Sequence, residues 1–411
     1  MKNILLIFIL ILVIQGCTDD EEVIFSPEIT FISPFITPEQ IDDWFEVKCN
    51  IIIEDATSVE VLTSGIILSK ESNPTIEADN VIISIDSSNV NRKISAGTTI
   101  ETRAENLDLN SIYFVKVFVK LGNNEVLYGQ EFSITTSKGD FWVELNYPEQ
   151  YKYLDRPIRV AHEGKYFYGI GMDDGVNRSW HSYNTQSGIW TELSSYPGTG
   201  GFDGTAFVIN DKIYVTAFSH SKETWEYDTE LDLWTQKSDL PVMEYGGFFS
   251  FSYNNEGYVG GGYGNNQVWK FNPSDESNGS DVRGNPLGKW HQLADHPNFE
   301  FSRSQGFAMG NKKYVLSKSR IFEYDIEGDD WSLITISPFN FGLPFGIDNT
   351  IYIVGENDVR TYNLDSSEWS TLGSSPYSNY VRLVYADAFI IGGAVYIGDF
   401  ASFYRYIPLV E

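Results

Sequence analysis

Apolar and polar residues alternate along most of the chain, and turn-forming residues separate the alternating runs. Alternation with a period of two is typical of β-strands that bury one face. Runs of this kind include Val59–Leu62, Val81–Ile85 and Tyr113–Lys120. No long stretch has the i, i+3, i+4, i+7 apolar spacing of an amphipathic helix. The pattern therefore predicts an all-β protein.

From about residue 140 to residue 411 the strand pattern repeats around tryptophan. Six segments contain a Trp followed by an apolar residue and a Pro, and they begin at Trp142, Trp190, Trp234, Trp290, Trp331 and Trp369. In four of them a Tyr stands seven residues before the Trp, at Tyr183, Tyr227, Tyr324 and Tyr362. In the Trp290 unit, Phe271 takes this place and a polar insertion at residues 274–288 lengthens the hairpin. The constant spacing predicts the same hairpin in each unit.

The two ends of the repeat predict how many units there are. No complete unit precedes Trp142, and the last unit reaches Glu411 without a Trp strand of its own. We therefore expect residues 140–145 to supply the outer strand of the last unit, for which we assign inner strands at 383–394 and 402–406. This arrangement closes a ring of six and removes two exposed strand edges.

These strands, hairpins and tryptophans resemble Kelch repeats. The double glycines Gly260-Gly261 and Gly392-Gly393 add to the resemblance, and we expect them to allow tight backbone packing near the centre. The other units lack such a pair, so the array is degenerate. The resemblance implies a six-bladed Kelch-like β-propeller over residues 140–411, in which each repeat Trp fills the space between neighbouring blades.

Residues 26–137 form a separate unit of alternating strands. The segment 107–113 has the spacing of a tyrosine corner, in which the hydroxyl of a buried Tyr113 bonds to the preceding backbone. The stretch Gly65–Ser69 followed by Asn73-Pro74 resembles fibronectin type III-like domains of bacterial surface proteins. This implies a β-sandwich that acts as a spacer. Cys49 lies on the apolar face of an alternating segment and is expected to be a buried small hydrophobe.

The first residues carry an export signal. Lys2 precedes an apolar run too short to span a bilayer, and the run ends at Cys17. Residues 1–17 resemble a bacterial lipoprotein signal peptide and lipobox, which implies lipidation of Cys17; an ordinary secretory signal is the alternative. The acidic residues of 18–25 look like a sorting signal or act only as a solvated tether. We expect an outer membrane lipoprotein that is anchored to the membrane by its lipid, and that is surface-exposed if the acidic run is a sorting signal.

Charge and composition exclude several functions. The net charge of −29 repels phosphate, which argues against nucleic acid as a partner. The five histidines are dispersed with no spacing suited to a shared metal, so we predict no metal and no cofactor. The acidic hairpin turns at 228–232, 325–330 and 365–368 could hold calcium, but turn formation explains them better.

Propellers bind ligands where the loops between blades meet at the central channel. The candidate ligand-binding residues in those loops are Arg159, Asp203, Glu244, Tyr245, Arg303, Tyr380 and Arg382. Arg159, Arg303 and Arg382 come from different blades and could converge on one anionic or polyhydroxyl ligand. Alternatively, the arginines pair with Asp203, Glu244 and Glu300 as ordinary salt bridges.

Three functions fit this organisation. The first is a binding module for a glycan or another cell-envelope protein. The second is a carbohydrate-active enzyme, because the implied fold is similar to that of periplasmic sialic-acid mutarotases. That resemblance implies catalytic roles for Glu244 and Arg303, although fold likeness alone says little about activity. The third is a structural scaffold.

Overall fold

The computed structural model describes residues 30–31, 35–41, 44–55, 59–95, 98–108, 111–137, 140–145, 154–242, 246–297, 303–378, 380–399 and 401–408. The predicted signal peptide, Cys17 and the acidic tether lie outside these ranges. Strands dominate the described chain, which has one 3₁₀ turn, η1 (Ser87–Asn89), and one short helix, α1 (Tyr380–Val384). The all-β prediction is confirmed. Within the described residues, we find no helix whose length and apolar character would let it cross a membrane.

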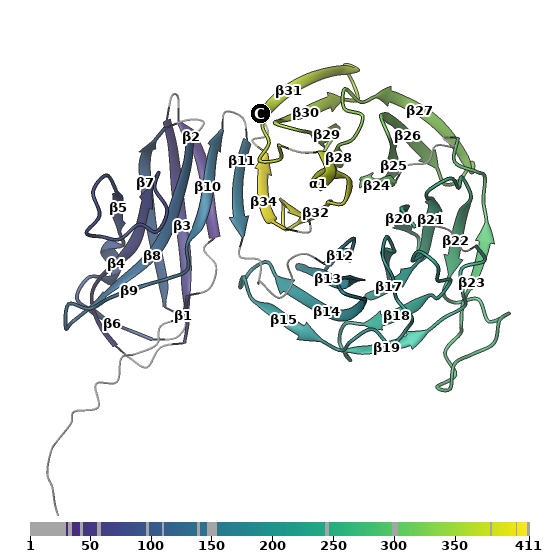
Figure 1. Ribbon diagram of the computed structural model, residues 1–411, viewed down its shortest axis with the longest axis horizontal. Coiled ribbons are helices and arrows are strands. Elements are labelled where there is room, and N and C mark those ends of the chain that lie inside the picture. Colours follow the sequence, from purple (N-terminus) through teal and green to yellow (C-terminus); the bar gives the residue numbers. More distant parts are fainter. Residues whose placement is uncertain are drawn as a thin grey trace, which may run out of the picture.

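The N-terminal part consists of antiparallel strands in two sheets (Figure 1). One sheet contains β1 (Thr30–Phe31), β2 (Phe35–Ile41), β3 (Trp44–Asp55) and β7 (Thr99–Leu107). The other contains β4 (Val59–Ser69), β5 (Ile82–Ile85), β6 (Arg92–Ile94), β8 (Ser111–Leu121), β9 (Val126–Tyr128) and β10 (Phe132–Ser137). Buried apolar residues of β7, such as Ile100, belong to one core with those of β4 and β8. The side chain of Cys49, on β3, lies outside the described side chains.

Tyr113 has the role that the sequence predicts. Its side chain is buried on β8, and its hydroxyl accepts a hydrogen bond of 2.9 Å from the backbone N–H of Asp108. The bond fastens the connection between β7 and β8, as expected of a tyrosine corner. Tyr113 is therefore a residue of the core.

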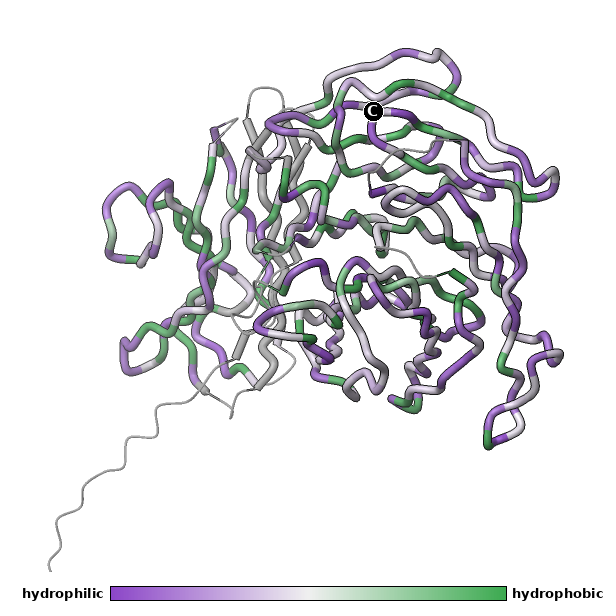
Figure 2. The backbone as a smooth tube through the Cα atoms, turned by 45° about the vertical axis from the view of Figure 1, so that its right-hand side comes forward, coloured by the Kyte–Doolittle hydropathy of each residue, from purple (hydrophilic) through white to green (hydrophobic). Residues whose placement is uncertain are grey.

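The C-terminal part is a β-propeller in which five separate four-stranded antiparallel sheets are arranged around a ring (Figure 1). The sheets are β12–β15 (Ile158–His162, Lys165–Met172, Val176–Asn184, Trp190–Leu193), β16–β19 (Thr205–Ile209, Lys212–Thr216, Trp225–Asp228, Leu233–Gln236), β20–β23 (Phe248–Tyr253, Glu256–Gly261, Val268–Asn272, Lys289–Gln292), β24–β27 (Ser304–Met309, Lys312–Ser317, Arg320–Asp325, Asp330–Ile336) and β28–β31 (Leu343–Ile347, Thr350–Val354, Asp358–Asn363, Glu368–Ser374). Apolar and polar residues alternate around the ring (Figure 2).

The remaining strands of the ring belong to a ten-stranded sheet that it shares with the N-terminal part. β32 (Asp387–Ile391), β33 (Ala394–Gly398), β34 (Phe403–Pro408) and β11 (Asp140–Leu145) are neighbours in that order, and the sheet then continues into β10, β8, β4 and β5. β11 pairs with β34 as predicted, with Trp142 opposite Tyr406. Because β11 also pairs with β10, the two parts of the protein are joined by continuous backbone hydrogen bonding, which the sequence did not predict.

Each predicted hairpin places its aromatic residue directly opposite its Trp. The pairs are Tyr183–Trp190, Tyr227–Trp234, Phe271–Trp290, Tyr324–Trp331 and Tyr362–Trp369. The Trp side chains also contact the preceding sheet, as predicted. Trp234, for example, packs edge-on against Trp180, and its indole N–H donates a 2.8 Å hydrogen bond to the carbonyl of Ser194. Trp234 therefore fills the space between two sheets and also satisfies one backbone carbonyl there.

Two details of the predicted repeat are wrong. Leu383 lies in α1 rather than in a strand, and β32 begins only at Asp387. Gly392 and Gly393 form the turn between β32 and β33, with φ of 59° and 82°, and a Cβ at either would meet no atom within 4 Å. Their role is therefore to allow positive φ. Gly260 does pack closely, because a Cβ there would lie 2.6 Å from the ring of Phe249.

Candidate binding site at the centre of the ring

The first strand of each sheet lies nearest the ring axis. β12, β16, β20, β24 and β28 each contact the first strand of the next sheet, and β32 contacts both β28 and β12. These strands begin at the same end of the ring, so their first residues crowd together. Several of these residues are small, including Thr205, Ala206, Ser250, Gly306 and Ala388, because little room remains near the axis.

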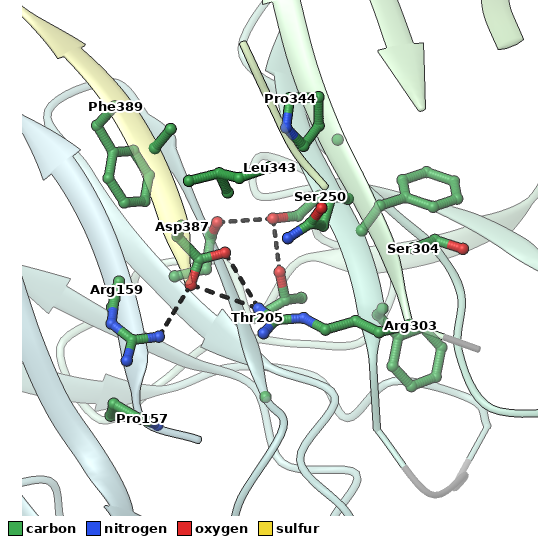
Figure 3. A pocket seen from close by; sticks show the side chains of 17 residues that line it. Pro157, Arg159, Thr205, Ser250, Arg303, Ser304, Leu343, Pro344, Asp387 and Phe389 are labelled. Atoms are coloured by element: carbon green, nitrogen blue, oxygen red, sulfur yellow. Dashed lines mark hydrogen bonds and ion pairs between the residues drawn. The ribbon is translucent and has the colours of Figure 1, made fainter. Parts of the chain in front are cut away.

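These first residues enclose a cavity of about 100 Å³ (Figure 3). Its lining comes from all six first strands or the residues just before them, and includes Pro157, Arg159, Thr205, Phe248, Phe249, Ser250, Arg303, Gln305, Leu343, Pro344, Asp387 and Phe389. Charged groups, hydroxyls and apolar rings therefore border the same space. Such a mixture is typical of a site that orients a ligand with a few polar groups.

Asp387 binds two arginines in this cavity (Figure 3). Nη1 of Arg159 lies 3.1 Å from Oδ2 of Asp387, and Nη2 of Arg303 lies 3.0 Å from Oδ1. The side chain of Arg159 is fully buried, and that of Arg303 is 12% exposed. One carboxylate thus faces two guanidinium groups, so the three side chains carry a net charge of +1. Removing one partner from a buried pair of this kind typically costs about 3–5 kcal/mol.

Backbone carbonyls from the segment before β32 hold the arginines in place. Arg159 donates to the carbonyl of Tyr385 at 2.8 Å, and Arg303 donates to that of Val384 at 3.0 Å. These bonds fix both guanidinium groups before any ligand arrives, which lowers the entropic cost of binding.

Neutral polar groups continue the lining opposite Asp387. The hydroxyls of Thr205 and Ser250 are 2.6 Å apart, and Ser250 also donates to the carbonyl of Ala206. The amide of Gln305 donates to the carbonyl of Ala386. The cavity wall thus offers hydroxyl and amide groups from three different sheets.

A second ion pair, Arg156–Asp203, lies in the loops beside the cavity. Nη1 of Arg156 is 2.9 Å from Oδ2 of Asp203, and the Asp203 side chain is fully buried. Its Oδ1 has no hydrogen-bond partner among the residues that the structure describes. Burial raises the pKa of Asp203, and the charges of Arg303 and Arg156 oppose that rise. Burial also raises the pKa of the neighbouring Tyr263, and the charge of Asp203 adds to the effect.

The structure separates the three arginines that the sequence grouped. Arg159 and Arg303 meet at the cavity, but Arg382 donates to Asp399 at 2.6 Å and to Ser402, and so holds α1 against the connection between β33 and β34. None of the three forms an ion pair with Asp203, although Arg303 is near enough for its charge to lower the pKa of that residue.

Other predicted residues fall beyond what can be described. Glu244, Tyr245 and Glu300 lie outside the described residues, so their predicted roles stay predictions. Tyr380 is the first residue of α1, and its side chain is also outside the description.

Asp387 was missed by the sequence reasoning although it organises the cavity. A usable signal exists, because each first strand ends in a two-residue turn to the second strand. Counting back four residues from that turn gives Arg159, Ala206, Ser250, Gly306, Pro344 and Ala388, and counting back five gives Ile158, Thr205, Phe249, Gln305, Leu343 and Asp387. Most of these residues line the cavity. The distance from this turn therefore marks the positions that line the axis, but not which side chains pair there.

Comparison with known proteins gives no family for the chain. No family model matches it, and no curated protein matches it. Among solved structures, that of YjhT matches with a TM-score of 0.49 at 15% identity, over 62% of this chain and 91% of the other. An auxiliary nutrient binding protein from Bacteroides thetaiotaomicron matches with a TM-score of 0.45 at 8% identity, over 87% of this chain and 93% of the other.

Proposed function

We propose that the protein is an outer membrane lipoprotein whose propeller binds a glycan in the central cavity. In this proposal β32, β33, β34 and β11 act as the sixth blade, and the N-terminal sheets act as a fibronectin type III-like spacer between the ring and a lipid on Cys17. The lipobox-like sequence at Cys17 supports the anchor, and the contacts of β32 with β12 and β28 support the closed ring.

The observation that carries the proposal is the fixed Arg159–Asp387–Arg303 group in a cavity that also has hydroxyl and aromatic walls. A sugar presents neighbouring hydroxyls that both donate and accept hydrogen bonds, and its C–H faces pack on apolar rings. Guanidinium groups donate several hydrogen bonds in a fixed geometry, and a carboxylate accepts them. The cavity therefore offers both kinds of partner at once.

The size of the cavity limits how much of a glycan enters it. At about 100 Å³ it is smaller than the roughly 300–1,000 Å³ typical of sites that enclose a whole small molecule. We infer that only the terminal part of the glycan enters, while the rest lies over the loops around Arg156, Asp203 and Tyr263. This arrangement suits recognition of a chain end.

The enzymatic alternative stays a prediction, because Glu244, one of its two residues, lies outside the described residues. Binding is the function that we propose, because the fixed Arg159–Asp387–Arg303 group and the hydroxyl and aromatic walls of the cavity support it directly.

A glycan array followed by calorimetric titration of the strongest hit tests the proposal. Gln305→Ala removes one amide from the cavity wall without breaking the arginine group, and we expect it to weaken binding about tenfold, which corresponds to roughly 1.4 kcal/mol. Arg303→Ala removes a fixed guanidinium group and should weaken binding by more than Gln305→Ala does.

Arg360→Ala is the matched control, because this arginine pairs with Asp358 on β30 and does not line the cavity. We expect the folded Arg360→Ala protein to bind with the affinity of the wild type. The proposal is wrong if no glycan binds, or if Gln305→Ala and Arg303→Ala bind as tightly as the wild type.

A further inference from the structure

A second group of chemically active side chains lies at the opposite ends of β12 and β16 from the cavity. His162 is the last residue of β12, three residues beyond Arg159, which places it roughly 10 Å further along the strand. Glu163 follows in the turn to β13, and Asp211 lies in the turn from β16 to β17. These three residues come from two neighbouring sheets and form a site separate from the cavity.

The geometry of the three side chains suits a shared cation. One ligand atom from each residue, the imidazole nitrogen of His162 and a carboxylate oxygen of Glu163 and of Asp211, lies within 4.8 Å of the other two. Nε2 of His162 is 3.7 Å from Oε2 of Glu163. Ligands at about 2.0–2.2 Å from a tetrahedral zinc ion lie roughly 3.3–3.6 Å from each other, so a small adjustment brings all three into contact with one ion.

The imidazole of His162 gives an independent indication. Its side chain is only 10% exposed, and its Nε2 is buried with no hydrogen-bond partner among the described residues. A buried polar nitrogen without a partner is unfavourable. This nitrogen lies 3.7 Å from Oε2 of Glu163, and a metal ion between the two atoms would satisfy it.

The neighbouring lysine does not take the place of the cation. Lys212, which follows Asp211 in the chain, forms its ion pair with Asp228. The ammonium group of Lys212 therefore does not compete with a cation for the carboxylate of Asp211, which lies near His162.

We propose that His162, Glu163 and Asp211 bind a divalent transition metal of the zinc class and so clip the first two sheets of the ring together. An imidazole with two carboxylates is a donor set that Zn²⁺ accepts, whereas Ca²⁺ and Mg²⁺ prefer oxygen ligands alone. Three protein ligands leave the fourth tetrahedral position for water. Sequence spacing predicted no metal site because the two turns are far apart in the chain.

The test is titration of the chelator-treated, dialysed protein with Zn²⁺, and separately with Ca²⁺ and Mg²⁺, by calorimetry and thermal unfolding. We expect one Zn²⁺ per chain and a rise in Tm, with no comparable effect of Ca²⁺ or Mg²⁺. His162→Gln, Glu163→Asn and Asp211→Asn should each weaken Zn²⁺ binding about 100-fold or more. Losing a residue that only hydrogen-bonds to a metal ligand already lowers metal affinity about 10–100-fold, and these three residues are the ligands themselves.

Glu163→Asn separates loss of a ligand from loss of fold. Glu163 has a φ of 47°, which asparagine adopts more readily than glutamate, so this variant should match or exceed the wild-type Tm in metal-free buffer. It should lose the rise in Tm that Zn²⁺ gives the wild type. His291→Gln is the matched control, because His291 also has a nearby carboxylate, Asp275 at 3.5 Å, but within the described part of the chain no third ligand is grouped with it.

The proposal is overturned if the wild type binds no Zn²⁺ at one per chain. It is also overturned if His162→Gln, Glu163→Asn and Asp211→Asn bind Zn²⁺ as tightly as His291→Gln. Because these residues lie away from the cavity, neither result bears on glycan binding.

Discussion

At the scale of single residues, burial sets the protonation of several side chains. His181 on β14 lies opposite Tyr168 of β13 and Glu192 of β15, and only 4% of it is exposed. Burial lowers the pKa of His181 to about 4, although the charge of Glu192 opposes the shift. The unfolded chain has a histidine pKa near 6.5. At a pH between about 4 and 6.5, His181 therefore binds a proton in the unfolded chain but not in the folded protein.

This difference predicts the pH dependence of stability. As pH falls from about 6.5 to about 4, protonation of His181 in the unfolded chain lowers the free energy of unfolding, and above pH 6.5 the loss is absent. His181→Gln should therefore reduce the slope of unfolding free energy against pH in this window. Urea unfolding at several pH values measures the slope. His291→Gln, at a half-buried histidine, is the control. If His181→Gln and His291→Gln both keep the wild-type slope, His181 does not contribute.

At the scale of elements, the acidic hairpin turns have a structural role that the sequence could only suggest. Asp232 has a φ of 49°, and its carboxylate accepts hydrogen bonds from the hydroxyl of Tyr227 at 2.6 Å and from the backbone N–H of Ser194 in the preceding sheet. Asp329 does the same with Tyr324 and with Ala294. A carboxylate at this position therefore joins the repeat tyrosine to the neighbouring sheet, which favours turn formation over calcium binding.

The Asp232 carboxylate should stabilise the fold in a pH-dependent way. Burial raises its pKa, but hydrogen bonds from Tyr227 and Ser194 outweigh burial and lower the pKa from 3.8 overall. The stabilisation is thus present above about pH 4 and is lost as pH falls below 3.8. Asp232→Asn should reduce the unfolding free energy by about 1 kcal/mol at pH 7 and by less at pH 3, measured by urea unfolding.

Two controls accompany this prediction. Asp329→Asn removes the equivalent acceptor of the hydrogen bonds from Tyr324 and Ala294, and should destabilise the fold by a similar amount at pH 7. Glu230→Gln changes an exposed carboxylate of the same turn and should have almost none. If Glu230→Gln destabilises as much as Asp232→Asn, general charge and not the specific hydrogen bonds explains the effect.

At the scale of the whole molecule, β11 joins the ring to the N-terminal sheets. It pairs with β34 on one side and with β10 on the other. The edges of β34 and β10 that face β11 are therefore not free along this stretch. Trp142, 1% exposed, packs against Tyr377, Tyr404 and Tyr406, and its indole N–H donates to the carbonyl of Ser374. The outer edge of β34 and the attachment of the N-terminal part thus depend on the same strand.

Trp142→Ala should therefore destabilise both parts together. We expect a loss of about 3–5 kcal/mol, typical of truncating a buried Trp. Hydrogen exchange should show reduced protection in β10 as well as in β34. Trp331→Ala, at the equivalent repeat position, should reduce protection mainly in β24–β27. Unchanged protection of β10 in Trp142→Ala would mean that the shared sheet does not couple the two parts.

The sequence by itself determined the strand repeat, the Tyr–Trp register and the pairing of residues 140–145 with the last strand. These features follow from local periodicity, because a hairpin of constant length places the same two residues opposite each other in every unit. Only the tertiary structure decided which distant side chains meet. Arg159 and Asp387 are 228 residues apart, and Arg382 bonds to Asp399 although the sequence analysis grouped it with the other two arginines. His162 and Asp211 likewise come from two different turns. Such contacts depend on how the sheets are arranged around the axis, and no spacing within one unit encodes that arrangement.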